Sequence, residues 1–460
     1  MLQEISPTRA LEFERRLQGE LRELARQIAE WTYNRLSPEQ AADAPHDVQH
    51  AGQGYRRLNE KTPNRNVATL FGKITLWRHG YRPWERDAGE PTIFPLERQL
   101  GLVEGATPAL AEAAARYLAE TGATQQTVLE RLRREHGVTW GVEKLRGLGQ
   151  NIAAAMSEFR REFQTQKVLD LLRQAADSRG KRKIVLAVGR DGITLCTQPH
   201  SFFEVATTAT LTVYDRRGRR LGSVFLAYAP ELGQGTMSDE LAALIRDVLA
   251  QWEGPLPRLC YVTDAGENEV KFYRRVLRPM RHPRTGQRLP WRWIVDYYHA
   301  AQRITTMAEA LFGDTPQAHA WAAKLRKLLK KPNGPARVLW SAAQMRSRYG
   351  LPKNRRQEFQ RAYNFIRKRT KHMQYAWFRG QGLPIGSGIT EAACKTVFTQ
   401  RLKLSGMRWG NRGAQAILDL RVCLLSDVWD ETYQAVLASY HALIPRIYAS
   451  PSCPPLRKPR

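Results

Sequence analysis

The residues from 183 to 296 alternate between apolar runs and helical segments in an order that leaves few choices of fold. Three β-rich runs come first, with links short enough for hairpins, and two further apolar runs follow, separated by a helical segment. Hairpin links pair strands antiparallel, whereas a strand reached through a helix can join the sheet in parallel. The order β-β-β-α-β-α-β-α therefore predicts a mixed α/β sheet. The predicted strands are 184–188, 202–214, 221–228, 259–263 and 291–295.

The chain carries a large excess of positive charge. It has 72 lysines and arginines against 44 aspartates and glutamates, which gives a net charge of +28 over 460 residues. A hydrophobic share of 42% is enough to fill the cores of about two to four domains. A folded protein with this much fixed positive charge is expected to bind a polyanion such as nucleic acid, because binding releases counterions.

Apolar run lengths and cysteine spacing argue against a membrane protein and against a secreted, disulfide-bonded protein. No apolar run approaches the roughly 18–20 residues that a membrane-spanning helix needs, and the first residues lack the pattern of a signal peptide. The five cysteines are scattered, with no close pair that could start a zinc site or a disulfide framework. We therefore expect a cytoplasmic protein with reduced cysteines and no membrane partner.

The N-terminal residues predict a helix over 8–36, followed by a linker at 38–50 and a β-hairpin at 67–84. Apolar side chains recur at alternating steps of four and three along one face of the helix, which is the spacing of a coiled-coil seam. A helix that packs on its own protein gives the same pattern, so both interpretations stay open. The seam residues are Leu17, Leu21, Leu24, Ile28 and Trp31.

A second helical region, from 107 to 156, has the spacing of a helix-turn-helix. A helix over 124–135 meets a turn at 136–139, and the next helix is expected to begin with Thr139 as its N-cap. This second helix would present Trp140, Lys144 and Arg146, together with Glu143, to a DNA groove. A plain helical hairpin fits the same residues.

The residues from 299 to 377 predict further helices with an extreme charge bias. Between 321 and 379, Glu358 is the one acidic residue, and aromatic residues are interleaved with the lysines and arginines. A charge run is usually a solvated face, but a nearly acid-free stretch of this length favours a surface that binds phosphates.

Three carboxylates lie at positions suited to a metal site. Asp191 and Asp264 each follow a predicted strand, and ligands of α/β sheets gather beyond the carboxyl ends of parallel strands. Glu391 lies in the segment PIGSGITEAACK, at the start of a predicted helix. Each of them alone could equally be a strand-end or capping acid. Three carboxylates brought together repel one another unless a divalent cation neutralises them, and their oxygens suit magnesium.

We therefore expect Asp191, Asp264 and Glu391 to bind Mg²⁺ or Mn²⁺, as two ions. Such ions, held about 3.5–4 Å apart, activate an attacking oxygen and stabilise the leaving oxygen of a phosphodiester. In this chemistry the basic surface would bind the phosphates of the nucleic acid, and the carboxylates would hold the metal ions that act on one of them.

The strand order, with these carboxylates on it, resembles the RNase H-like catalytic core of DDE transposases. The long helical segment before Glu391 is similar to the insertion of the Mutator-like group, and Asp296-Tyr297-Tyr298-His299 matches the Asp/Cys-x-x-His motif of insertion-bearing members. The segment GSGITEAACK, followed by RLKLSGMRWGNRGAQAILDLR, resembles the signature of bacterial insertion-sequence transposases of the ISKra group. The resemblance covers roughly 183–430.

The resemblance implies a role for each matching residue. Asp191, Asp264 and Glu391 would be the catalytic triad, and Asp296 and His299 would support it. Trp409 could equally pack in the core. The implied DNA contacts beside the scissile phosphate are Lys395, Arg401, Lys403, Arg408 and Trp409.

The function implied is that of a nucleoid-associated bacterial transposase. It would bind double-stranded DNA at terminal inverted repeats, cleave a strand with metal, and transfer it to target DNA as a homodimer assembled on the DNA. Two alternatives stay open, a structure-specific RNase H-like nuclease and a non-catalytic DNA-binding protein descended from a transposase.

The expected organisation has seven segments. They are 1–50 (helix and linker), 51–105 (small β-hairpin region), 106–182 (helix-turn-helix and linker), 183–300 (first part of the core), 301–384 (basic helical insertion), 385–445 (C-terminal helices of the core) and 446–460 (basic disordered tail).

Overall fold

The computed structural model describes residues 6–36, 44–50, 52–84, 91–199 and 202–447. The chain divides into two compact units, one formed by Met1–Phe159 with Trp429–Arg460 and the other by Arg160–Val428. Helix α5, Val142–Asp177, runs through the boundary at residue 159. Helix α15, Trp429–Ile447, belongs to the N-terminal unit, although the sequence placed its residues with the core. The predicted tail at 448–460 lies outside the described residues.

The N-terminal unit contains a three-stranded antiparallel sheet in the order β1-β2-β3. The predicted hairpin is confirmed as β2 (Gln53–Thr69) and β3 (Gly72–Pro83). Its first strand begins well before residue 67, because it also pairs with β1, Asp47–His50. The prediction of a linker is therefore wrong for these four residues, while 37–43 lie outside the described part of the chain.

Helix α1, Pro7–Arg35, confirms the predicted N-terminal helix, with the Ser6 hydroxyl accepting a hydrogen bond from the Arg9 N–H at its start. Its polar face lies on β3, where the Asn34 amide donates to the Thr75 carbonyl and the Thr75 N–H donates to Glu30. The five seam residues are exposed, from 41% for Leu17 to 61% for Trp31. The helix therefore packs on its own unit through a face other than the seam.

Three helices of the N-terminal unit follow the sheet and a short helix α2, Pro95–Gln99. They are α3 (Pro108–Ala119), α4 (Gln125–His136) and α5. Thr124 caps α4, and Gly137 ends it with a positive φ of 65°. The prediction that Thr139 caps the next helix is wrong, because α5 begins at Val142 and then continues without a break for 36 residues.

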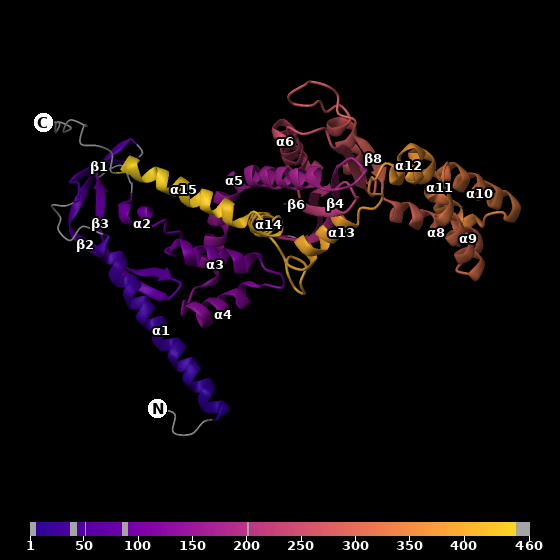
Figure 1. Ribbon diagram of the computed structural model, residues 1–460. Helices are drawn as coiled ribbons and strands as arrows, with labels where there is room; N and C mark the ends of the chain where they lie inside the picture. The colour runs from indigo at the N-terminus through magenta and orange to yellow at the C-terminus, as the bar shows by residue number, and fades with distance from the viewer. Residues whose placement is uncertain (1–5, 37–43, 51, 85–90, 200–201, 448–460) are drawn as a thin grey trace. The chain divides into compact units, whose positions relative to one another are not determined.

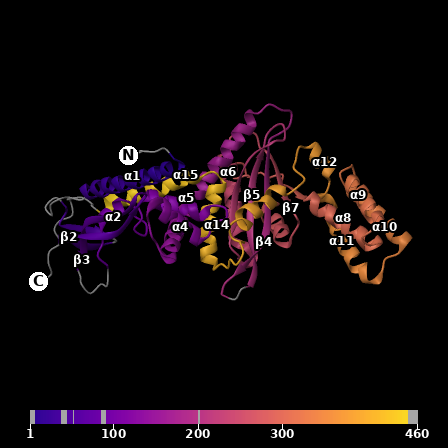
Figure 2. The same ribbon diagram turned by 90° about the horizontal axis from the view of Figure 1, so that it is seen from below.

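The second unit is built on a five-stranded sheet in the order β6-β5-β4-β7-β8. Strands β4, β5 and β6 pair antiparallel, and β4, β7 and β8 pair parallel, so the predicted mixed α/β sheet is confirmed. Figure 2 shows β5, β4 and β7 side by side. The strands are β4 (Val185–Thr197), β5 (Phe202–Tyr214), β6 (Arg220–Tyr228), β7 (Arg258–Thr263) and β8 (Arg292–Val295).

The first strand is longer than predicted, and this changes the position of Asp191. The sequence ended the strand at residue 188, but β4 runs through Gly189–Gly192 and pairs with β5 along its whole length. Asp191 therefore lies within a strand and not at its end. Continued pairing with β5 compensates for the two glycines, which are weak strand formers on their own.

Some helices pack against the sheet, and others form a helical group next to it. Helix α6 packs against β5 and β6, α14 packs against β6, and α13 packs against β4 and β5. Helices α8 to α11 pack on one another as a group, drawn in orange tones in Figure 1. The bounds are α6 (Gly235–Gln251), α7 (Glu267–Phe272), α8 (Tyr297–Phe312), α9 (Pro316–Leu329), α10 (Gly334–Tyr349), α11 (Arg356–Arg369), α12 (Tyr375–Gly380), α13 (Gly388–Ala393) and α14 (Asn411–Leu425).

One hydrophobic core joins the sheet to this helical group. It includes Leu186 of β4, Tyr261 of β7, Ile304 of α8 and Phe359 of α11. The basic helices are thus attached to the sheet through apolar contacts, which leaves their charged faces to solvent. Among the described residues, no helix has the length and apolar character needed to cross a membrane.

Candidate metal centre

The sheet register brings three aspartates into one row. Gly189 of β4 lies opposite Val262 of β7, so two residues further along Asp191 comes level with Asp264. Thr263 lies opposite Val295 of β8, and the Asp296 N–H donates to the Thr263 carbonyl at 2.7 Å, which extends the pairing by one residue. Neighbouring strands are about 4.8 Å apart, so the row is short enough to form one site.

Asp264 lies close enough to Asp191 to raise the pKa of its carboxyl. Burial raises the pKa of the Asp191 carboxyl above its ordinary value, and the charges of Asp264 and Glu391 raise it further. The Gly192 N–H, which donates to Asp191 Oδ1 at 2.8 Å, acts in the opposite direction. The three predicted ligands therefore lie within electrostatic range of one another.

Glu391 reaches this row because α13 docks closely on β4 and β5. Thr390, the preceding residue, is buried, and its hydroxyl lies 2.9 Å from the Thr210 hydroxyl of β5. A Cβ atom on Gly189 would fall far inside van der Waals contact with the Thr390 hydroxyl oxygen. The glycine in β4 is thus the opening that lets α13 approach the sheet.

Asp296, directly after β8, holds helices α8 and α13 together through hydrogen bonds. It is fully buried, and its Oδ1 accepts a hydrogen bond from the His299 N–H at 2.9 Å, which caps helix α8. Its Oδ2 accepts from both the backbone N–H and the hydroxyl of Ser387, the residue before α13. Both carboxylate oxygens of Asp296 are therefore engaged in joining β8, α8 and α13.

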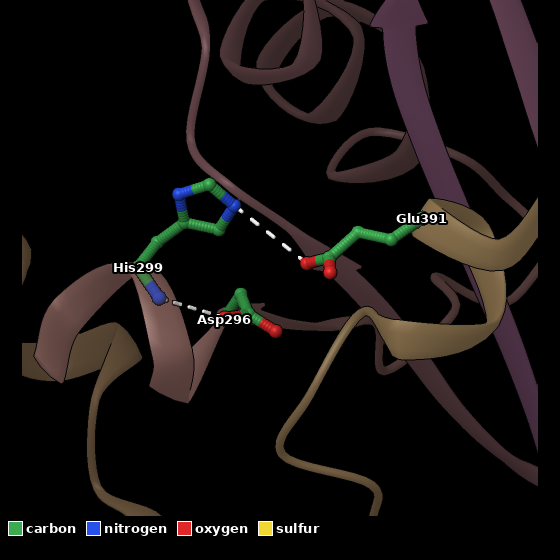
Figure 3. Close-up of side chains that lie close together, drawn as sticks. All are labelled: Asp296, His299 and Glu391. Atoms are coloured by element: carbon green, nitrogen blue, oxygen red, sulfur yellow. Dashed lines mark hydrogen bonds and ion pairs between the residues drawn. The ribbon is translucent and has the colours of Figure 1, made fainter. Parts of the chain in front are cut away.

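Asp296, His299 and Glu391 form a compact cluster, with potential ligand atoms all within 4.8 Å of one another. The His299 ring points toward Glu391, with 3.7 Å between Nε2 and Oε1 (Figure 3). The Ser387 hydroxyl lies 2.8 Å from the same Glu391 oxygen. The structure thus combines Glu391 of the predicted triad with both residues of the predicted Asp-x-x-His motif.

The donor set suits a hard divalent cation. Carboxylate oxygens of Asp191, Asp264 and Glu391 are the ligands that magnesium prefers, and an imidazole nitrogen also accepts manganese or zinc. Burial is the main cause of the raised pKa of Asp191, and the charges of Asp264 and Glu391 add to it, so a bound cation would favour the ionised carboxylate. Asp296 is less suited to bind a metal because its oxygens already accept hydrogen bonds.

The sequence analysis missed a buried ion pair beneath this site. Arg190 and Glu269 are 1% and 7% exposed, and their side chains approach within 4.0 Å. Arg190 also donates to the hydroxyl of Ser238 and the side-chain carbonyl of Gln234. Burial raises the pKa of Glu269, and the charge of Asp264 adds to this effect. In the sequence, the only indication of this ion pair was the arginine directly before Asp191 in the segment Gly-Arg-Asp-Gly.

The predicted DNA contacts after Glu391 divide into exposed and buried residues. Lys395, Lys403 and Arg408 are exposed. Arg401 is only 1% exposed, and its guanidinium lies 5.5 Å from the centre of the Trp409 ring. Trp409 is partly buried and donates its indole N–H to the Leu402 carbonyl, which is the packing role left open by the sequence.

The predicted contacts in the N-terminal unit divide in the same way. Trp140 is 9% exposed and lies 5.3 Å from the Lys144 ammonium group. Burial lowers the pKa of Lys144, and the nearby charge of Lys73 lowers it further. Arg146 is exposed and pairs with Glu143 at 2.8 Å. Among these three residues, Arg146 is the one presented on the surface of the helix.

No protein-family model matches this chain, and no curated protein matches it either.

Proposed function

We propose that this protein is a DNA transposase with an RNase H-like catalytic core, which cleaves and joins DNA strands with the help of divalent metal. The observation that carries the proposal is that the sheet register sets Asp191 level with Asp264 and that the charges of Asp264 and Glu391 act on Asp191, although the three lie 73 and 127 residues apart in the sequence. The sheet order β6-β5-β4-β7-β8 and the helical insertion before Glu391 support it.

Asp191, Asp264 and Glu391 would hold Mg²⁺ or Mn²⁺. The bound metal would supply activation of the attacking oxygen and stabilisation of the leaving oxygen. Asp296 and Ser387 are positioning residues, because they hold the start of α13 and the Glu391 carboxylate in place. His299 lies beside Glu391, where it can orient that carboxylate or a water molecule.

The reaction consists of two displacements at phosphorus. In the first, the oxygen of water bonds to phosphorus and the bond to O3′ breaks, which leaves a 3′-hydroxyl and a 5′-phosphate. In the second, the freed 3′-hydroxyl attacks a phosphodiester of target DNA and displaces its 3′-oxygen. The exposed Lys395, one turn after Glu391, can contact the phosphate, and the N-terminal helices α4 and α5 would bind the terminal inverted repeats as a helix-turn-helix.

The test is DNA cleavage and strand transfer by carboxylate variants. Asp191→Asn, Asp264→Asn and Glu391→Gln should each reduce cleavage with Mg²⁺ or Mn²⁺ to background, because each removes an oxygen ligand. The substrate is DNA from the ends of the element that surrounds the gene. A gel assay separates the nicked product from the joined product.

Glu267→Gln is the matched control. Glu267 is an exposed carboxylate three residues after Asp264 that pairs with Lys271 at 2.6 Å, outside the cluster. It should retain full activity. Cleavage that survives any of the three triad substitutions refutes the proposal, and cleavage without joining would make the protein a nuclease.

A further inference from the structure

An aromatic cavity lies on the second unit, away from the carboxylates, along the edge strand β8. It has a volume of about 810 Å³ and is lined by residues that include Tyr273, Arg292, Trp293, His372 and Trp377. Asp296 follows the last residue of β8, whereas Arg292 is its first residue. The aromatic cavity and the metal cluster are therefore associated with opposite ends of this strand.

Trp377 provides the accessible ring of this cavity, whereas the Trp293 ring beside it is 5% exposed. Trp377 is 47% exposed, and the Arg292 guanidinium lies 5.5 Å from the centre of its ring. Behind them the Trp293 and His372 rings lie 4.3 Å apart, and Tyr273 lies 5.3 Å from Trp293. Exposed tryptophan rings and arginine planes are the surfaces on which unstacked bases bind.

His372 provides a hydrogen-bonding group in the same lining. Its Nδ1 lies 3.2 Å from the Trp293 carbonyl, and since a carbonyl only accepts, Nδ1 carries the proton. Burial and the nearby charges of Lys371, Arg274 and Arg369 lower the pKa of His372, which favours a neutral ring. Nε2 is then a hydrogen-bond acceptor of the kind that pairs with a base N–H.

Two basic cavities adjoin the aromatic cavity. The first, of about 400 Å³, shares Tyr273, Trp293 and His372 with it and adds Arg274 and Lys368. The second, of about 610 Å³, shares Ala376 of α12 with it. The cations of this second cavity are Arg182, Lys330 and Arg379. None of the residues that line the three cavities is an aspartate or glutamate.

The crowding of like charges in the first basic cavity points to an anionic ligand. Burial lowers the pKa of Arg369, and the charges of Arg303 and Arg274 lower it further. A bound phosphate would relieve this repulsion, because it supplies the opposite charge that the lining lacks. Arg369 also donates to the Ala265 carbonyl, directly after Asp264 in the chain.

We propose that the aromatic cavity binds one unpaired base of a DNA strand, while the two basic cavities hold the phosphates on either side of it. The inference rests on the proposed function in taking DNA as the ligand. A paired base inside a duplex cannot present its face to Trp377, so the strand must be single at this point. Cations on both sides favour a continuous strand over a free nucleotide.

The test is binding of the full-length protein to a fluorescent oligothymidine of about 12 nucleotides, within the usual site size for such proteins. Anisotropy is measured in EDTA, so that cleavage cannot contribute. Trp377→Ala should weaken binding about tenfold, within the range expected for loss of one stacked base. Trp377→Phe should retain most of the affinity, because the ring and its packing on Phe378 are kept.

Trp340→Ala is the matched control, since Trp340 is a 66% exposed tryptophan on α10 outside the three cavities. It should bind like the unaltered protein. The inference is overturned if Trp377→Ala binds normally, if Trp340→Ala weakens binding equally, or if a duplex of the same length loses as much affinity. It is also overturned if thymidine monophosphate competes as well as the strand does.

The strand-binding test can fail or succeed independently of the cleavage test of the proposed function. Glu391→Gln should bind the oligothymidine normally even though it does not cleave. Normal cleavage with no effect of Trp377→Ala refutes this inference alone, whereas strand binding by a protein that never cleaves refutes the catalytic proposal alone.

Discussion

Ser387 connects two carboxylates of the metal cluster, Asp296 and Glu391. Its hydroxyl lies 2.9 Å from Asp296 Oδ2 and 2.8 Å from Glu391 Oε1. A hydroxyl has one hydrogen to donate, so it cannot satisfy both carboxylates at once. A cation bound by Glu391 would satisfy the carboxylate that the hydroxyl leaves without a donor.

Asp191→Asn should stabilise the metal-free protein at neutral pH. Burial, with the charges of Asp264 and Glu391, raises the pKa of Asp191, so its ionised form is less favourable in the folded chain than in the unfolded chain. An acid with a raised folded pKa costs stability above that pKa and costs nothing below its ordinary value of 3.8. The gain in melting temperature should therefore be largest at neutral pH and vanish on acidification.

Thermal unfolding in EDTA over a pH series checks this prediction. Glu267→Gln should show no such gain, because its lysine partner lowers the pKa of Glu267. Added Mg²⁺ should stabilise the unaltered protein, by about 2.7 kcal/mol at a hundred times the dissociation constant, and have little effect on Asp191→Asn. A variant that melts lower than the unaltered protein at neutral pH would contradict the prediction.

At the scale of elements, the short helix α13 of the site depends on the long strand β4 of the sheet. Helix α13 has six residues, too few to be stable alone, and docks where Gly189 leaves space for Thr390. Strand β4 extends beyond the predicted end, so it carries Gly189 and Asp191 on one continuous ladder. The position of Glu391 therefore follows from the length of β4.

Gly189→Ala should displace α13 and reduce cleavage by about a hundredfold or more, a loss typical of a misplaced catalytic group. The added methyl group would overlap the Thr390 hydroxyl and lie 3.0 Å from the Thr210 hydroxyl. Thr390→Ala removes the first overlap, so the double variant Gly189→Ala with Thr390→Ala should recover part of the activity. Cleavage rates of the single and double variants decide the matter, and a double variant no better than Gly189→Ala would show that α13 is not held in this way.

At the scale of the whole molecule, the net charge of +28 has an uneven distribution. The acid-free cavities lie around α12 and β8, and exposed cations follow Glu391, whereas the predicted metal-binding carboxylates lie on β4, after β7 and on α13. A polyanion attracted to the basic surfaces is thereby brought to the part of the protein that can bind metal.

Binding of duplex DNA should fall steeply with salt. Each phosphate contact contributes about 0.9 to the slope of log affinity against log salt, so Lys403→Ala combined with Arg408→Ala should reduce that slope by about 2. Both side chains are exposed beyond α13. Lys271→Ala serves as the control, because Lys271 already pairs with Glu267. Anisotropy titrations at several salt concentrations measure the slopes, and an unchanged slope in the double variant would remove these residues from the DNA interface.

Most of the elements could be predicted from the sequence, and the site only in part. Strands β5 to β8 lie within one residue of their predicted bounds, because alternation and apolar runs report burial among neighbouring residues. The full length of β4 could not be predicted, since its glycines are stabilised by pairing with a distant strand. The start of α5 was missed because Thr139 has the chemistry of an N-cap without the backbone position.

The sequence by itself determined the α/β alternation, the excess of positive charge and the identity of the scarce carboxylates. The tertiary structure decided how they are used. It joined Asp296 to Ser387 across 91 residues, buried Arg401 beside Trp409, and placed Arg292 next to Trp377. Local patterns report hydrogen bonding and burial within a few residues, whereas contacts between distant segments depend on how complete elements pack, which no local pattern encodes.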